Sequence, residues 1–235
     1  MTEPRFVQGV SVPRSGHHLL ARMLGNYFAG RWRYYDLYAE GHFFNRPPRG
    51  TTFAKHHDNW LNQGRLFRVR FPVRFRKSGA FLVQVREPYA AFISAWELRC
   101  RERPKAPATR DAWLHYVRRQ TDYVAKFLRK WVEPEAPPGV RLILTYDQLT
   151  EQPEAALDAA IRFCAPGEQP DPDRLSHIVR HQGVAREREV AHFRYHDPAL
   201  AEELQERLGD TGRLNRLADA RNLDTLRALT IQVEA

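Results

Sequence analysis

Short apolar segments followed by helical patterns constrain the fold of this chain more than any other feature. Residues 5–12, 80–86 and 141–146 have the apolar content of buried strands, and helical spacing follows at 16–28 and 88–101. Parallel strands need a crossover connection, usually a helix, and the helices then cover both faces of the sheet. We therefore predict an α/β fold with a mostly parallel central sheet flanked by helices on both faces.

The remaining segments are consistent with a single domain. A broad apolar face at helical spacing predicts a long helix over 111–131, and Pro153 is well placed to open another helix. Residues 31–50 are aromatic and basic without a clear period, and we expect loop and short helix there. The predicted boundaries are 1–235 for the domain, about 5–165 for its core and about 173–235 for a charged, helical C-terminal segment.

The chain is basic, with a formal net charge of +9 and an isoelectric point of about 9.9. Such an excess attracts anions, but its sign does not choose among nucleic acid, acidic glycans and phosphorylated cofactors. The mean hydropathy of −0.61 and the strand-sized apolar runs predict no transmembrane segment. The first residues lack the pattern of a signal peptide, and two cysteines make no disulfide framework, so we expect a cytoplasmic location.

The segment FVQGVSVPRSGHHLL, residues 6–20, contains an apolar strand, a glycine turn and the start of a helix. The first turn of a helix has unpaired N–H groups and partial positive charge, which favour a bound phosphate or sulfate. Gly16 lets the backbone approach such an anion, and Arg14 offers a planar set of donors. No GxxxxGK[ST] pattern occurs, so this is not a Walker A loop. Taken alone, an ordinary strand–turn–helix explains the segment as well as an anion site does.

This loop resembles the segment that holds the 5′-phosphosulfate in sulfotransferases that use 3′-phosphoadenosine 5′-phosphosulfate (PAPS). The matching residues are Pro13, Arg14, Ser15 and Gly16. His17 and His18 stand where many members of the family have threonines. The resemblance implies a P-loop-like nucleotide-binding topology. The residues that it places at the cofactor are Arg14, Ser15, Gly16, His17 and His18.

Two further segments fit the same family. Arg86, at a strand end, and Ser94, in the following helix, match the site of the 3′-phosphate. A guanidinium can clamp a phosphate while a hydroxyl adds a neutral hydrogen bond. The segment LILTYDQL matches one that would place Tyr146 near the adenosine. The usual basic C-terminal segment has no clear match, and Arg180 and Arg186 are weak candidates for its role.

The segment FAKHHDNW supplies the Lys-x-His pattern that many members of this family carry after the first helix. The resemblance makes His57 the general base and Lys55 the group that stabilises the bridging oxygen, with Arg14 as a further catalytic residue. A histidine suits this role because its ordinary pKa is near neutral. Strand alternation predicts that Lys55 and His57 share one face while His56 lies on the other. Asp58 either orients His57 or stabilises its protonated form, or it lies at the surface.

The resemblance implies sulfuryl transfer from PAPS to a hydroxyl or amine of a carbohydrate or small-molecule acceptor, without a nucleic-acid partner. Tyr34, Tyr35 and Trp60 are candidates for acceptor binding. Adjacent histidines occur without a cysteine partner or an HExxH pattern, and this reaction requires no metal. Two alternatives stay open: a kinase-like enzyme that binds a nucleotide, and a basic nucleic-acid-binding protein that uses residues 65–77.

Overall fold

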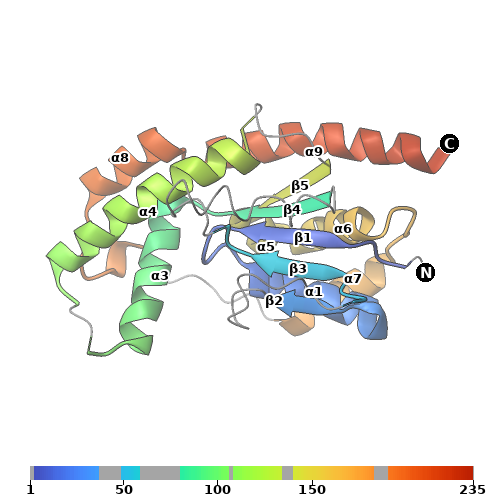
Figure 1. Ribbon diagram of the computed structural model, residues 1–235, viewed down its shortest axis with the longest axis horizontal. Helices are drawn as coiled ribbons and strands as arrows, with labels where there is room; N and C mark the ends of the chain where they lie inside the picture. Colours follow the sequence, from blue (N-terminus) through green and yellow to red (C-terminus); the bar gives the residue numbers. More distant parts are fainter. Residues whose placement is uncertain are drawn as a thin grey trace.

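The central feature of the fold is a sheet of five parallel strands in the order β2-β3-β1-β4-β5 (Figure 1). The strands are β1 (Val7–Ser11), β2 (Tyr34–Asp36), β3 (Phe53–His56), β4 (Ala80–Val85) and β5 (Val140–Thr145). The computed structural model describes residues 3–36, 49–58, 80–105, 108–133, 140–182 and 190–234. Within these ranges, each strand pair is parallel, as the alternating pattern predicted.

Among the described residues, helices lie between β1 and β2, between β4 and β5, and after β5. They are α1 (His17–Phe28), α3 (Pro88–Glu102), α4 (Arg110–Trp131), α5 (Tyr146–Glu151), α6 (Pro153–Cys164), α7 (Pro172–Gln182), α8 (Pro198–Leu208) and α9 (Thr211–Glu234). Proline opens α3, α6 and α8, where the missing N–H costs no hydrogen bond. The side chain of Thr109 caps α4 by accepting from the N–H of Ala112.

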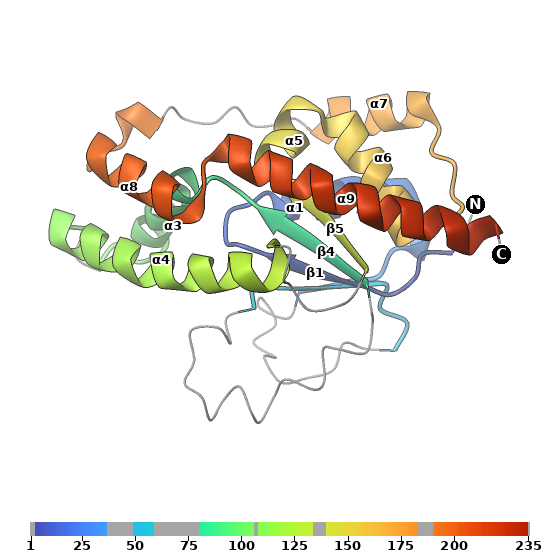
Figure 2. The ribbon, with the colours of Figure 1, turned by 90° about the horizontal axis from the view of Figure 1, so that it is seen from above.

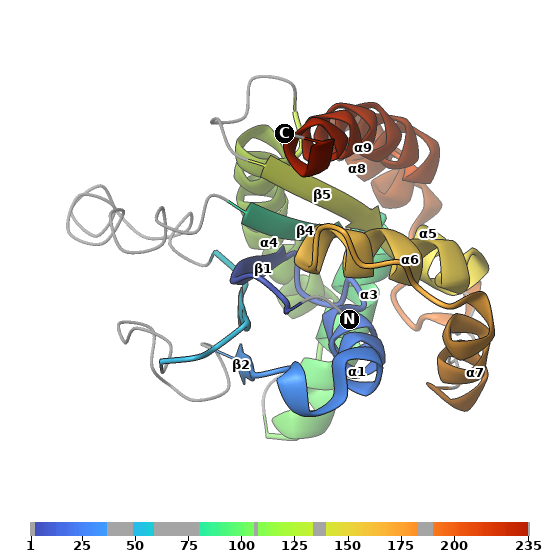
Figure 3. The same cartoon turned by 90° about the vertical axis from the view of Figure 1, so that its right-hand side faces the viewer.

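Two apolar clusters cover the two faces of the sheet. Leu82 and Leu142 face α1, α6 and α7, whereas Val83 and Ile143 face α3, α4 and α8. Figures 2 and 3 show α5, α6 and α7 on one side of the sheet and α4 on the other. The predicted α/β architecture with helices on both faces is therefore confirmed, and both faces of the central strands are buried.

The segment predicted as loop and short helix over residues 31–50 is partly wrong. A short 3₁₀ turn does occur at Ala29–Arg31, but Tyr34–Asp36 then forms the edge strand β2. This strand pairs with β3, and aromatic residues suit such a half-buried pleated position. Residues 37–48 and the basic segment 65–77 lie outside the described residues.

The C-terminal helix α9 lies along the edge strand β5 (Figure 1). The amide of Asn222 donates to the carbonyl of Ile143 at 2.7 Å and accepts from its N–H at 2.8 Å. Thr225 donates its hydroxyl hydrogen to the carbonyl of Arg141 at 2.5 Å. Side chains of α9 thus take the place of a neighbouring strand on this edge.

We expect replacement of Asn222 by alanine to lower the free energy of unfolding by about 2 kcal/mol, because both peptide groups of Ile143 lose their partner. For a chain of this length the midpoint of thermal unfolding should fall by roughly 4–8 °C. Calorimetry on Asn222→Ala and on Leu223→Ala measures this effect. Leu223 is 56% exposed and serves as the matched control. Equal losses in the two variants would contradict the role given to Asn222.

Candidate functional site

The candidate site lies where β1, β3 and β4 end, at the point where the chain crosses from one half of the sheet to the other. The loop between β1 and α1 contains two residues in the left-handed region, Arg14 with φ 70° and Gly16 with φ 84°. A Cβ at Gly16 would lie only 3.0 Å from the ring of Tyr146, so both its conformation and its space favour glycine. No described side chain caps the first turn of α1. That turn keeps its donors available for a ligand.

Ser15 fastens this loop to the sheet. Its fully buried hydroxyl lies 2.7 Å from the carbonyl of Val12 and 3.1 Å from the carbonyl of Gln84, to which it can donate. In this arrangement the hydroxyl hydrogen is used within the protein. Ser15 can therefore present its backbone to an anion more readily than its hydroxyl.

The structure brings Arg14, Arg86 and Ser94 together from three different parts of the chain. Arg14 donates through Nε to the hydroxyl of Ser94 at 3.1 Å, and Arg86 donates to the carbonyl of Arg14 at 3.0 Å. The guanidinium of Arg86 lies 4.2 Å from the ring centroid of Tyr146. All the sequence segments that resembled a nucleotide site therefore meet at the start of α1.

The charge of this cluster is positive. Burial, followed by the charges of Arg86 and Arg101, lowers the pKa of Arg14, although a guanidinium stays protonated at any working pH. Among the described residues, no carboxylate forms an ion pair with Arg14. An anion bound here would compensate this half-buried cation.

His57 is held in one orientation beside Lys55. Its Nδ1 lies 2.8 Å from the carbonyl oxygen of Ser11, which can only accept, so Nδ1 carries the hydrogen. The opposite nitrogen, Nε2, lies 2.8 Å from Nζ of Lys55. Burial, with the nearby charge of Lys55, lowers the pKa of His57 to about 3. His57 is thus neutral near pH 7, with its lone pair on Nε2.

The neighbours of His57 in the sequence lie partly as predicted: Lys55 and His56 agree with strand alternation, whereas Asp58 does not lie at the surface. Lys55 and His57 share a face, and His56 points elsewhere, with its Nδ1 accepting from the N–H of Asp58 at 3.1 Å. The surface role predicted for Asp58 is wrong, and among the described residues its carboxylate contacts α4. Its carboxylate is buried and accepts from Lys130 at 2.6 Å and from the indole of Trp131 at 2.7 Å. Asp58 has φ 49°, which turns its side chain to α4.

The adjacent histidines at the start of α1 differ in their surroundings. His17 is buried, its ring centroid lies 5.0 Å from that of His57, and neither ring nitrogen finds a hydrogen-bond partner among the described residues. Burial, with the charge of Lys55, lowers the pKa of His17, so this ring is neutral. His18 is exposed and contacts the ring of His17 at 4.0 Å. Two unused nitrogens in a buried ring point to a ligand at this position.

A metal is a less suitable occupant than an anion. His17, His18 and Asp36 bring one nitrogen or oxygen each within 4.8 Å of one another. However, the ammonium of Lys55 already lies 3.3 Å from the carboxylate of Asp36. A divalent cation would have to bind beside this buried positive charge, so we assign no metal to the cluster.

Two residues of the site were missed from the sequence, Asp36 and Ser11. Asp36 ends β2 directly opposite Lys55 in the register of β3, and only knowledge of that pairing could have revealed it. Among the acceptor candidates, Tyr34 donates its hydroxyl hydrogen to Asp36 at 3.2 Å and stacks on Phe53, while Tyr35 is half-buried on the same strand. Trp60 lies outside the described residues.

The candidates for a C-terminal covering residue gain no support. Arg180 is exposed on α7, and its Nε donates to the carbonyl of Ser176 in the same helix. Arg186 lies outside the described residues. None of the described helices is long and apolar enough to cross a membrane.

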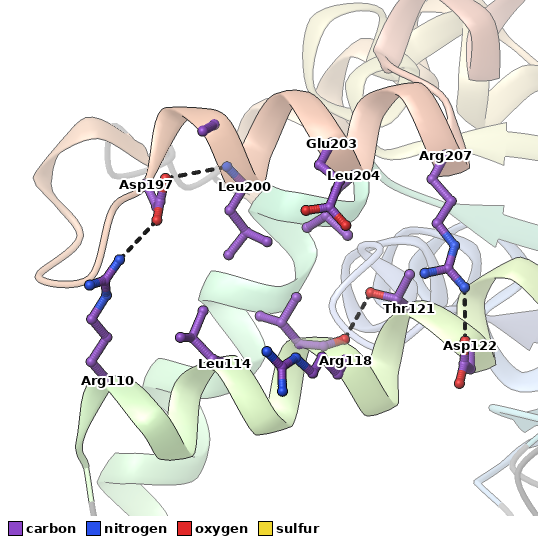
Figure 4. A pocket seen from close by; sticks show the side chains of 12 residues that line it. Arg110, Leu114, Arg118, Thr121, Asp122, Asp197, Leu200, Glu203, Leu204 and Arg207 are labelled. Atoms are coloured by element: carbon purple, nitrogen blue, oxygen red, sulfur yellow. Dashed lines mark hydrogen bonds and ion pairs between the residues drawn. The ribbon is translucent and has the colours of Figure 1, made fainter.

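A separate hollow of about 520 Å³ lies between α4 and α8. Ion pairs join the two helices across it, from Arg110 to Asp197 at 3.1 Å and from Arg207 to Asp122 at 3.0 Å (Figure 4). None of the predicted site residues lines this hollow. The ion pairs hold α8 against α4, and the hollow between them is not part of the candidate site.

The fold is similar to that of a sulfotransferase. The crystal structure of mouse sulfotransferase SULT7A1 complexed with PAP matches with a TM-score of 0.55, over 92% of this chain and 88% of that chain. The sequence identity is 14%, so the match establishes the fold. No protein-family model and no curated protein matches the sequence.

Proposed function

We propose that this protein transfers a sulfuryl group from PAPS to a hydroxyl or amine of a carbohydrate or small-molecule acceptor. The observation that carries the proposal is the convergence of Arg14, Arg86 and Ser94 at an uncapped helix start, beside the buried pair of Lys55 and His57. The fold shared with a sulfotransferase supports it.

The donors at the start of α1 suit a ligand with two anionic groups, a phosphate and a phosphosulfate. Arg86 and Ser94 would hold the 3′-phosphate, while Arg14 and the first N–H groups of α1 would hold the 5′-phosphosulfate. His17 would add a neutral donor, which explains why its buried ring lacks a partner within the described residues. The ring of Tyr146, already against Arg86, would lie beside the adenosine.

PAPS supplies an activated sulfuryl group, whose transfer leaves 3′-phosphoadenosine 5′-phosphate (PAP). His57 takes the proton of the acceptor on Nε2 while the acceptor oxygen or nitrogen forms its bond to sulfur and the bond to the phosphate oxygen breaks. Lys55 donates to that departing oxygen and stabilises its growing negative charge. Arg14 neutralises charge on the transferred group. The protein thus contributes position, a base and compensating charge.

We expect PAP to stabilise the protein by about 2.7 kcal/mol at a concentration of 100 times its Kd, because it binds the native state. A melting assay with PAP, adenosine 5′-phosphate, ATP and a short oligonucleotide measures this shift. In Arg86→Ala, the affinity for PAP should fall by about tenfold or more, while that for adenosine 5′-phosphate changes little. Arg207→Ala, on the exposed ion pair of α8, is the matched control.

Each result of this assay has a definite meaning. A shift with ATP alone would favour a kinase-like nucleotide enzyme, and a shift with the oligonucleotide alone would favour a nucleic-acid-binding protein. Either would overturn the proposed function. If PAP shifts the melting temperature, a screen of candidate acceptors with PAPS, in which sulfation is detected as an increase in acceptor mass, would identify the acceptor. The cytoplasmic location stays a prediction from the sequence.

A further inference from the structure

Lys55 is paired with a carboxylate that no sequence motif indicated. Asp36 and Lys55 are direct partners in the register of β2 and β3, and Nζ lies 3.3 Å from Oδ2 of Asp36. The two side chains are 10% and 3% exposed. Tyr34 also donates to Oδ2, so Asp36 is held from a second direction. A buried ammonium of this kind needs a carboxylate nearby to remain charged.

The hydrogen bond from Lys55 to His57 uses Nε2, the nitrogen with which His57 would have to accept a proton as a general base. Because Nδ1 of His57 donates to Ser11, only the lone pair on Nε2 can accept a proton. A lysine ammonium is a donor only, so Lys55 donates to that same lone pair at 2.8 Å. His57 cannot deprotonate an acceptor while this hydrogen bond is in place.

The anion site lies close enough to open this contact. The ring of His17, the first residue of α1, is 5.0 Å from the ring of His57, and Lys55 is near enough to lower the pKa of His17. An anion bound at the start of α1 would compete with the neutral Nε2 for the ammonium. The hydrogen bond to Nε2 has one charged partner, whereas a hydrogen bond from Lys55 to an anion joins two opposite charges and adds their Coulomb attraction.

We propose that Asp36 is the positioning residue of a latch, in which Lys55 covers Nε2 of His57 until an anionic cofactor binds at the start of α1. This inference rests on the proposed function. On binding, the hydrogen bond from Lys55 to Nε2 breaks and the ammonium, still protonated and still beside Asp36, donates to a cofactor oxygen. Nε2 is then open to the proton of the acceptor. The base becomes available only when a nucleotide anion, PAPS or PAP, is bound at the start of α1.

The first test observes the latch directly. Histidine side chains of the full-length protein are labelled with ¹⁵N, and the His57 signal is assigned from its absence in His57→Asn. Without ligand, Nε2 of His57 should give the signal of an unprotonated nitrogen that accepts a hydrogen bond. Saturating PAP should move this signal toward that of a nitrogen without a donor. PAP binding that leaves the signal unmoved overturns the latch alone, whereas absence of PAP binding overturns the proposed function and the latch with it.

The second test addresses Asp36. In Asp36→Asn, kcat should fall by roughly 10- to 100-fold, because Lys55 loses its anchor, while the Kd for PAP changes by less than about threefold. Asp36→Glu, which restores the charge, should recover part of kcat. Asp122→Asn removes a carboxylate from the distant ion pair with Arg207 and is the matched control. Unchanged kcat in Asp36→Asn, or a loss that Asp122→Asn reproduces, overturns the role of Asp36.

Discussion

His57→Asn should lower kcat for sulfuryl transfer by about 10²–10⁴-fold and leave the Kd for PAP nearly unchanged. The asparagine amide can keep the hydrogen bond that Nδ1 makes with the carbonyl of Ser11. It has no counterpart of Nε2, so the variant removes the proton acceptor and little else. Steady-state rates with PAPS and a working acceptor, together with calorimetric titration of PAP, measure both quantities.

His56 provides the matched control for this prediction. It is adjacent in sequence, 7% exposed compared with 8% for His57, and it points away from Lys55. In His56→Asn, the side-chain oxygen can still accept from the N–H of Asp58, and kcat should stay close to that of the wild type. Near-normal turnover in His57→Asn, or an equal loss in His56→Asn, would show that His57 is not the base.

Lowering the pH from 7 to 5 should strongly destabilise the protein, because three buried histidines are neutral in the folded state. Burial lowers the pKa of His56 to about 4 and of His57 to about 3, and it lowers that of His17 as well. The unfolded chain, with histidine pKa values of about 6.5, binds more protons than the folded protein below that pH. Stability is therefore complete above pH 6.5 and is lost as the pH falls toward the folded values.

Each of these histidines should remove about 2 kcal/mol of unfolding free energy at pH 5. The sum is a large part of the roughly 5–15 kcal/mol that stabilises an ordinary domain. Urea unfolding at pH 7, 6 and 5 measures the loss. His56→Asn should make the pH dependence shallower by about one proton. A free energy of unfolding that stays constant from pH 7 to 5 would contradict this prediction.

Local patterns predicted much of the fold and part of the site. The turn at Gly16 and the strands β1, β4 and β5 depend on short runs of residues, so they could be predicted from the sequence alone. The shared face of Lys55 and His57 follows from strand alternation and is confirmed. The nucleotide-binding roles of Arg14, Arg86 and Ser94 stay predictions, although the structure brings the three residues together.

The contacts that escaped prediction join residues far apart in the chain. Asp36 meets Lys55 only because β2 and β3 pair in a particular register. Ser11 meets His57 because β1, which ends at Ser11, pairs directly with β3. Asp58 seemed a natural partner of His57 from its position, but its backbone conformation turns it to Lys130 and Trp131. Register and single dihedral angles are set by tertiary packing, which residue spacing does not report.

The position of α9 along β5 also determines how copies of this protein can meet. An uncovered edge strand is a template for the strand of another molecule, and it leads to sheet extension and aggregation. Here the amide of Asn222 and the hydroxyl of Thr225 occupy main-chain groups of β5 that an incoming strand would need. Helix α9 therefore blocks the addition of another strand to β5 and so prevents polymerisation at this edge of the sheet.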